Sequence, residues 1–188
     1  MHIGGVRALV GCLVISGAIL GTAAAASAQE AKATVVGGGQ GSETVYTVSP
    51  RVDINPRSGY YPKLVLGLGG SVSPDGTRKT YQARVVITHT YNGLQHFSST
   101  TVNRTQKLPT RILDSSSDCG AAGPCRYTET VMLQLPEALL RSALDSKRPL
   151  RFEIRGGSAF VTGAIPLSHI SAMLDQSNRL SPRARSGA

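Results

Sequence analysis

The stretch that decides the fold is Tyr61–Gly93, YPKLVLGLGGSVSPDGTRKTYQARVVITHTYNG. On both sides of its central turn signal, apolar side chains recur at every second position, which is the period of a strand with one buried face. Between the two runs, the segment 73–76 has Pro74 and Gly76 where a type I turn with a left-handed exit requires them. The stretch therefore predicts two antiparallel strands joined by a tight hairpin.

Asn92-Gly93 closes the same stretch and has the residue pair that a two-residue type I′ loop favours. It predicts a second hairpin, in which residues 94–102 return as the third strand of a meander. In the register of such a loop, His89 faces His96 across the strand pair.

Strand and helix patterns continue to the end of the chain. A strand is expected over 126–135, and a hairpin over 150–165 turns at Gly156-Gly157, so that Ile154 faces Ala159 and Phe152 faces Val161. Pro136 and Pro166 each open an amphipathic segment, as Pro does in the first turn of a helix. The predicted fold is mainly β, an antiparallel β-sandwich-like domain with two short helices.

Composition limits the domain organisation. The chain has 188 residues, 40% of them apolar and 16% charged, with 21 Gly and 10 Pro. These values argue against coiled coils and against a chain disordered throughout. A single β-rich domain is expected over 43–175, after a flexible Gly-rich leader at 29–42 and before a disordered basic tail at 176–188.

The N-terminus has the three-part layout of a secretory signal peptide, residues 1–28. A basic start reaches Arg7, an apolar run of 14 residues follows at 8–21, and small residues lead to cleavage after Ala28. The apolar run is shorter than the roughly 20 residues that cross a bilayer, and no other segment approaches that length. The expected location is the periplasm or the medium. A retained membrane anchor and lipidation of Cys12 are the alternatives.

Cys119 and Cys125 are the two cysteines that follow the leader. An even number of cysteines in an exported chain predicts a disulfide, here closing a short loop that contains Gly and Pro. A redox pair or a metal-binding pair is the alternative, but the spacing is not C-x-x-C and two thiols alone do not complete a zinc site.

His89 and His96 are the candidate metal ligands. Two imidazoles facing each other across a strand pair could begin a copper or zinc site. Two neutral rings packed at the end of a sheet are the alternative. No other cofactor is expected.

No catalytic residue is assigned, because local signatures such as G-x-S-x-G, H-E-x-x-H and the P-loop are missing. A hydrolase whose site is assembled from distant residues stays open, since triads need no local motif.

Positive charge dominates, with 20 Lys and Arg against 11 Asp and Glu. Candidate basic surface residues are Lys147, Arg148, Arg151, Arg155, Arg179, Arg183 and Arg185. An envelope protein or an anionic polysaccharide or lipid surface is the expected partner. Nucleic acid is not expected, because the chain has only six Tyr, three Phe and no Trp to stack on bases. A solvated surface without a partner is the alternative.

Together these patterns favour an exported, non-enzymatic β-domain protein of the bacterial envelope that acts as a binding or accessory module. A periplasmic copper- or zinc-binding protein and a hydrolase are the two alternative functions.

Overall fold

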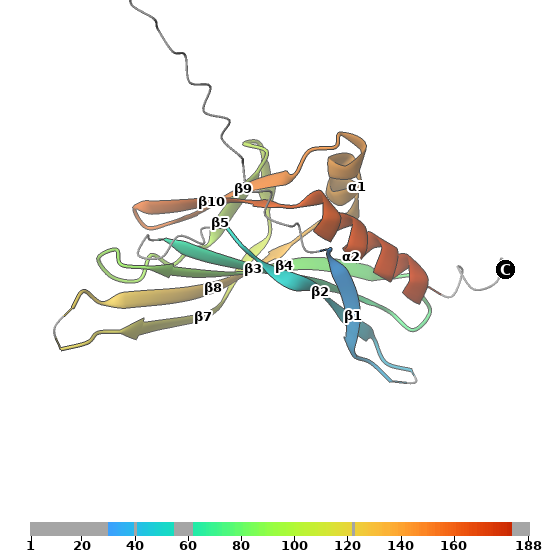
Figure 1. Cartoon of the computed structure of the whole chain (residues 1–188), viewed down its shortest axis with the longest axis horizontal. Helices are drawn as coiled ribbons and strands as arrows, with labels where there is room; N and C mark the ends of the chain where they lie inside the picture. Colours follow the sequence, from blue (N-terminus) through green and yellow to red (C-terminus); the bar gives the residue numbers. More distant parts are fainter. Residues whose placement is uncertain (1–29, 40, 55–61, 122, 182–188) are drawn as a thin grey trace, which may run out of the picture.

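The computed structural model describes residues 30–39, 41–54, 62–121 and 123–181, which form two antiparallel sheets and two helices (Figure 1). The predicted signal peptide lies outside the described residues. The elements are β1 (Lys32–Gly37), β2 (Thr44–Asp53), β3 (Lys63–Val72), β4 (Lys79–His89), β5 (Ser99–Val102), β6 (Gln106–Leu108), β7 (Thr110–Asp118), β8 (Arg126–Gln134), α1 (Glu137–Asp145), β9 (Leu150–Gly156), β10 (Ala159–Ile165) and α2 (Leu167–Leu180).

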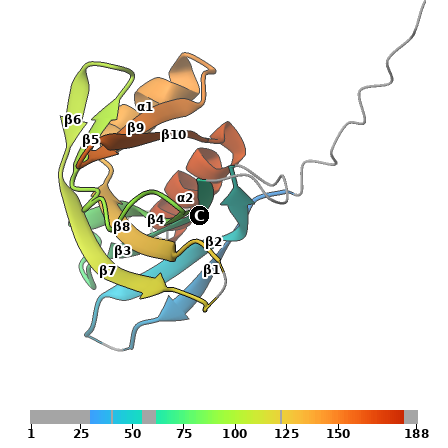
Figure 2. The same cartoon turned by 90° about the vertical axis from the view of Figure 1, so that its left-hand side faces the viewer.

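Sheet A contains six strands in the order β1-β2-β3-β4-β8-β7, and sheet B contains four in the order β10-β9-β5-β6. The two sheets face each other across a common core, with α2 between β10 and the β1–β2 side of sheet A (Figure 2). The predicted fold class is confirmed: the chain is mainly β, with two antiparallel sheets and two short helices. Among the described residues, no helix has the length and apolar character needed to cross a membrane.

The hairpin between β3 and β4 is confirmed and is the longest regular strand pair. Its register runs from Val72 opposite Lys79 to Lys63 opposite Thr88, and Gly76 has the positive φ of 70° that the turn requires. Asp75 stabilises the turn by accepting hydrogen bonds from the Ser73 hydroxyl and from the Thr77 hydroxyl (2.7 Å) and N–H (3.1 Å). These bonds, from Ser73 and then Thr77, lower the pKa of Asp75 to about 2.

The second predicted hairpin is wrong. Strand β4 ends at His89, and β5 does not return along it but pairs with β6 and β9 in sheet B. Gly93 has a positive φ of 81°, whereas Asn92 is not among the described residues with positive φ, so the pair does not form the type I′ loop. Residues 90–98 instead cross from one sheet to the other.

The hairpin between β9 and β10 is confirmed, but its predicted register is wrong by two residues. Gly156 belongs to the ladder opposite Ala159, and Ile154 therefore faces Val161. The loop is Gly157-Ser158, with Gly157 at a positive φ of 53°, which fits a type II′ turn. A shift of two residues leaves every side chain on its predicted face.

Both predicted domain boundaries differ from the structure. The leader expected to be flexible contains β1, which pairs with β2 from Lys32 opposite Ser49 to Gly37 opposite Val45, with a bulge at Val36. The tail expected to begin at residue 176 is helical through Leu180, because α2 continues to bury side chains as far as Ser177. A Gly-rich composition and a basic charge therefore misled the sequence prediction at both ends.

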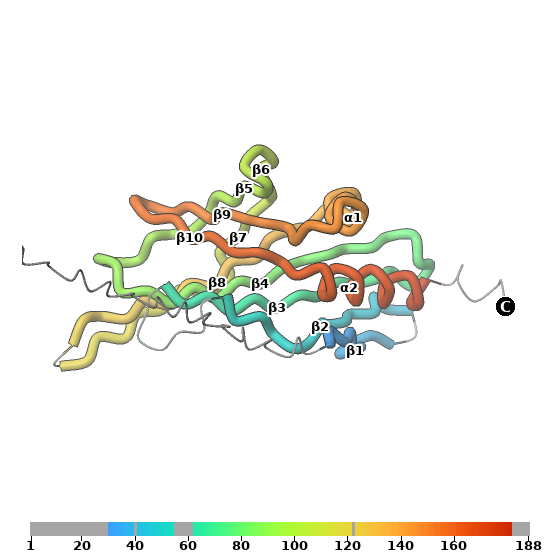
Figure 3. Tube along the Cα trace, turned by 45° about the horizontal axis from the view of Figure 1, so that its top comes forward, coloured from blue at the N-terminus to red at the C-terminus, as the bar shows by residue number. Residues whose placement is uncertain are grey.

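The two helices begin directly after Pro136 and Pro166, as predicted, and close the core. Helix α2 packs on β1, β2 and β3 and also contacts α1 (Figure 3). Its residues Ile170 and Met173 are completely buried. On the opposite side, only Pro109 separates β6 of sheet B from β7 of sheet A. The sandwich is thus covered by a helix on one side and joined by a short connection on the other.

Candidate functional site

A fully buried histidine–carboxylate contact lies at the end of β4. His89 Nε2 is 3.1 Å from Glu129 Oε1 on the adjacent strand β8, and both side chains have no exposed surface. The Glu129 carboxylate also accepts the backbone N–H groups of Gln95 (2.7 Å) and Phe97 (3.2 Å). One carboxylate therefore fixes residues 90–98 against sheet A, which is why this segment does not form a hairpin.

Aromatic rings enclose His89. Its imidazole stacks on Tyr91 and Tyr127, with centroid distances of 4.9 and 5.5 Å, and meets Phe97 edge-on at 5.7 Å. The Nδ1 atom is buried and has no hydrogen-bond partner among the described residues. This environment favours a packed structural role for His89, although its ring partners are tyrosines and a phenylalanine and not the second histidine that the sequence analysis paired with it.

His96 is exposed and has a positive φ of 52°, so it does not face His89. The predicted strand pairing of the two histidines is wrong. Copper or zinc binding stays a prediction, but the facing histidines that suggested it are not formed. In the part of the chain that the structure describes, no cluster of three or more His, Cys, Asp or Glu side chains could hold a metal ion.

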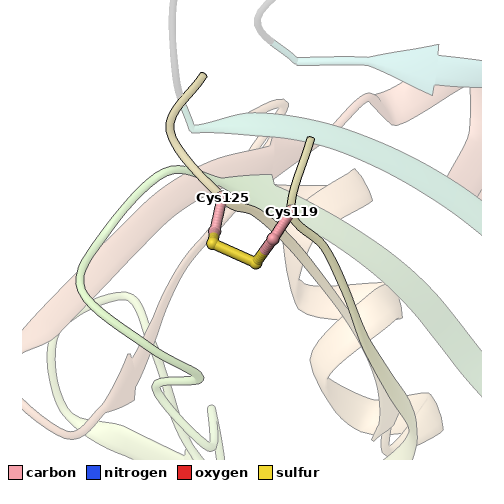
Figure 4. Close-up of a disulfide and its surroundings, with 2 residues drawn as sticks. All are labelled: Cys119 and Cys125. Atoms are coloured by element: carbon pink, nitrogen blue, oxygen red, sulfur yellow. A yellow bond between two sulfur atoms is a disulfide. The ribbon is translucent and has the colours of Figure 1, made fainter. Parts of the chain in front are cut away.

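Cys119 and Cys125 form a disulfide with an S–S distance of 2.06 Å (Figure 4). Cys119 follows the last residue of β7, and Cys125 precedes the first residue of β8. The predicted disulfide is confirmed, and it joins the two strands at the tip of their hairpin.

The predicted basic residues divide into four groups. Lys147, Arg148 and Arg151 are exposed near the start of β9. Arg155 is engaged, because its Nε lies 2.5 Å from Glu153 Oε1 and its guanidinium lies 5.6 Å from the centre of the Phe160 ring. Arg179 lies in the last turn of α2. Arg183 and Arg185 lie outside the described residues.

Two open hollows flank Phe160 on β10. The larger, of about 500 Å³, is lined by Tyr91, Asn92, Gln95, Ser158, Ala159 and Phe160. The smaller, of about 340 Å³, lies between β10 and the neighbouring ends of β2 and β3, and is lined by Ile54, Pro62, Leu64, Phe160, Val161 and Thr162. Phe160 belongs to both hollows and is 56% exposed, the second-highest value among the large exposed hydrophobic side chains of the described residues.

No described strand pairs with the other side of β10. Strand β10 is the edge of sheet B, and β9 is its only described strand partner. The carbonyl oxygens of Arg151 and Arg155 accept N–H groups from residues 98–103, so these two residues turn their backbone groups away from β10. In an antiparallel ladder, two residues that lie opposite each other either both direct their backbone N–H and C=O groups toward the partner strand or both direct them away from it. The outward-directed backbone groups of β10 are therefore those of Phe160, Thr162 and Ala164.

A serine and a histidine meet at the start of α2. Ser168 Oγ lies 3.3 Å from His169 Nδ1, and His169 Nε2 lies 2.9 Å from the Pro50 carbonyl oxygen, to which it can only donate. The histidine is thus oriented to accept from the serine, as a general base would be. Neither residue lines either hollow beside Phe160.

A polar network docks the helices onto sheet A. The Tyr81 hydroxyl lies 2.9 Å from Ser177 Oγ of α2 and donates to Glu137 of α1 at 3.0 Å. Burial raises the pKa of Tyr81 to about 12, and the Glu137 charge adds to the effect. The pKa of Glu137 is lowered: burial acts against this shift, but the hydrogen bonds from Arg141 and Tyr81 outweigh it. Because Glu137 is shared between Tyr81 and Arg141, the network is satisfied internally and has a structural role.

Comparison of the chain with protein-family models, curated proteins and solved structures found no match. By its geometry, the edge of β10 is the strongest candidate site. Sequence reasoning missed Phe160 as a candidate binding residue. Phe160 alternates with inward-facing Ala159 and Val161, and this alternation was the available signal, whereas nothing local indicates the distant partners of Glu129.

Proposed function

We propose that this protein is an exported binding module of the bacterial envelope that holds an extended peptide segment of a partner protein along the edge of β10. The observation that carries the proposal is the open edge itself, where outward backbone groups run beside two hollows that share Phe160. Peptide recognition by strand addition uses both features. Main-chain hydrogen bonds supply affinity, and pockets for alternate side chains supply specificity.

The edge of β10 also lacks the usual protection against pairing. Edge strands in soluble proteins commonly carry charges, proline or a bulge, which discourage the addition of another strand. Strand β1 has such a bulge at Val36. Strand β10 is AFVTGAI and has a regular register with β9 throughout, so it has no charge, proline or bulge.

Export is part of the proposal and is supported by two sequence features. Residues 1–28 have the layout of a signal peptide. The disulfide between Cys119 and Cys125 is a bond that persists in oxidising compartments such as the periplasm.

A proline at Thr162 tests the proposal, because it removes one outward N–H without removing a ladder hydrogen bond to β9. Peptides are selected on the purified protein from a displayed library, and the affinity of the best one is measured by fluorescence anisotropy. Thr162→Pro is expected to weaken binding at least about tenfold, since it removes a main-chain hydrogen bond and blocks the approach of the added strand.

Thr162→Ala is the matched control, because it changes the side chain and keeps the N–H group, and it should retain the affinity. Phe160→Ala should weaken binding as well, since it removes the wall that the two hollows share. Equal affinities for Thr162→Pro and Thr162→Ala, in variants that melt like the parent, would exclude strand addition at this edge. A failure to select any peptide would also overturn the proposal.

A further inference from the structure

A second surface lies on the outer face of sheet B and meets the β10 edge at Thr162. Along β9, Leu150, Phe152 and Ile154 face the core, so Arg151, Glu153 and Arg155 face outward. The register places Thr101 of β5 and Thr162 of β10 on either side of Glu153, with Lys107 of β6 beyond Thr101. This face therefore carries charged and hydroxyl side chains, with the exposed Phe160 opposite Arg155 at one end.

Five exposed cations gather at one end of this face, which we call the basic face: Arg104, Lys107, Lys147, Arg148 and Arg151. Arg151 and the turn that carries Arg104 are joined directly, because the Asn103 N–H donates to the Arg151 carbonyl at 3.0 Å. Lys147 and Arg148 form the connection that leads into β9.

The cations of the basic face are not neutralised within the described structure. None of the five forms an ion pair with a described residue. The nearby Glu153 is already bound by Arg155. Asp145, the last residue of α1, is the other acidic residue close in sequence to the cluster. A surface with several unpaired charges of one sign attracts polyanions.

We infer that the basic face binds an acidic polysaccharide. The hydroxyl groups of Thr101 and Thr162 lie next to the charged residues, and hydroxyls can donate to and accept from the hydroxyl groups of sugars. The cations supply attraction to carboxylate or sulfate groups along the polymer.

The other polyanions fit this surface less well. Membrane surfaces are bound with apolar side chains that enter the lipid. The exposed Phe160 lies at the other end of the face from the cations: it is opposite Arg155, four residues and about 13 Å along β9 from Arg151. Single-stranded nucleic acid needs aromatic rings among the cations. A protein interface needs an apolar centre, which the five cations and their threonine neighbours do not provide.

The test compares binding of the purified protein to immobilised polygalacturonate and dextran sulfate, with neutral dextran as the blank. Binding to both acidic polymers is expected, and it should fall steeply as sodium chloride is raised. The double variant Arg104→Glu/Arg151→Glu should weaken it about tenfold or more.

Arg84→Glu/Arg111→Glu is the matched control, because it makes the same change in net charge with two exposed arginines on sheet A. In the register both lie opposite Met132, away from the basic face. This control should bind almost as tightly as the parent protein.

Three results would overturn the inference. They are equal losses in the two double variants, equal retention on neutral dextran, and binding to vesicles of phosphatidylcholine and phosphatidylglycerol without binding to the polysaccharides. Melting curves of both variants show whether a loss of binding reflects unfolding. The peptide-selection experiment uses different residues, so either proposal can fail while the other stands.

Discussion

Glu129 decides the path of the chain between the two sheets. Its carboxylate is fully buried on β8, yet it receives hydrogen bonds from the His89 ring and from two backbone N–H groups of residues 90–98. A buried carboxylate is tolerated only when it is well paired in this way. Glu129 thus accepts backbone N–H groups of residues 90–98 that would otherwise bond to a neighbouring strand.

Replacing Glu129 with Ala should destabilise the protein by about 3 kcal/mol, because it leaves buried hydrogen-bond donors without an acceptor. Glu153→Ala is the control, since Glu153 is partly exposed in its pair with Arg155 and should cost less than about 1 kcal/mol. Chemical denaturation measures both losses. Equal losses would mean that Glu129 is not the main attachment of residues 90–98.

Asp75 makes the stability of the β3–β4 turn depend on pH. Its pKa is lowered to about 2 from an ordinary value of 3.8, chiefly by the Ser73 and Thr77 hydrogen bonds. A lowered carboxylate pKa contributes stability that is fully present above the unfolded value and is lost as pH falls through the folded value. The contribution should therefore disappear between about pH 3.8 and pH 2.

Asp75→Asn should lower the melting temperature at pH 7, and the difference from the parent protein should shrink as pH falls over that range. Thermal melts followed by circular dichroism across a pH series measure the difference. Asp114→Asn, on an exposed strand position of β7, is the control for the loss of one negative charge. A difference that stays constant down to pH 2 would contradict this role of Asp75.

At the scale of the elements, the sequence predicted best where the signal is local. Pro74 and Gly76 define the β3–β4 turn, and Pro136 and Pro166 mark the starts of both helices, because each acts through the backbone of its immediate neighbours. Asn92-Gly93 failed because Glu129, more than thirty residues later, binds the segment that follows it. Nothing in the sequence of residues 90–98 indicates that their backbone N–H groups donate to one distant carboxylate.

The β7–β8 hairpin depends on its disulfide more than the rest of sheet A does. Beyond Leu113, every described side chain of β7 is exposed, so little apolar burial supports this part of the ladder. The covalent link between Cys119 and Cys125 closes the strands at their far end.

Cys119→Ser/Cys125→Ser should therefore fray this hairpin. The entropic estimate for so short a loop is roughly 2 kcal/mol. Amide hydrogen exchange should become faster in residues 115–118 and in their β8 partners, while the β3–β4 ladder should keep its protection. Unchanged exchange at residues 115–118 would show that the ladder is stable without the disulfide.

At the scale of the molecule, one apolar core joins both sheets and both helices. The alternating pattern of the strands predicted this sandwich, because each sheet must bury one face. The pattern could not show which strands join which sheet. The placement of β5 beside β9, and of β10 at an open edge, follows from contacts between residues far apart in the chain, and so the candidate site was not predictable.

Met173 tests whether the two sheets unfold together. It is completely buried in α2, among core residues from both sheets. Met173→Ala should cost about 3 kcal/mol, the usual range for a large residue truncated in a core. Ser171→Ala, on a partly exposed position of the same helix, should change stability little.

The expected result for Met173→Ala is one cooperative transition at lower denaturant concentration, with far-ultraviolet and near-ultraviolet circular dichroism changing together. Two separate transitions would show that sheet A and sheet B are independent units.

The pairing of β4 with β8 in the middle of sheet A has a consequence for the order of folding. Between these neighbours the chain runs through residues 90–125, which build part of sheet B and then return as β7. The β3–β4 and β9–β10 hairpins can form from local contacts, but sheet A is complete only after this long loop has closed. Loop closure lowers the entropy of the chain before the contacts that stabilise it are made. We therefore expect the non-local pairings, β4 with β8 and β5 with β9, to slow folding relative to a chain of local hairpins.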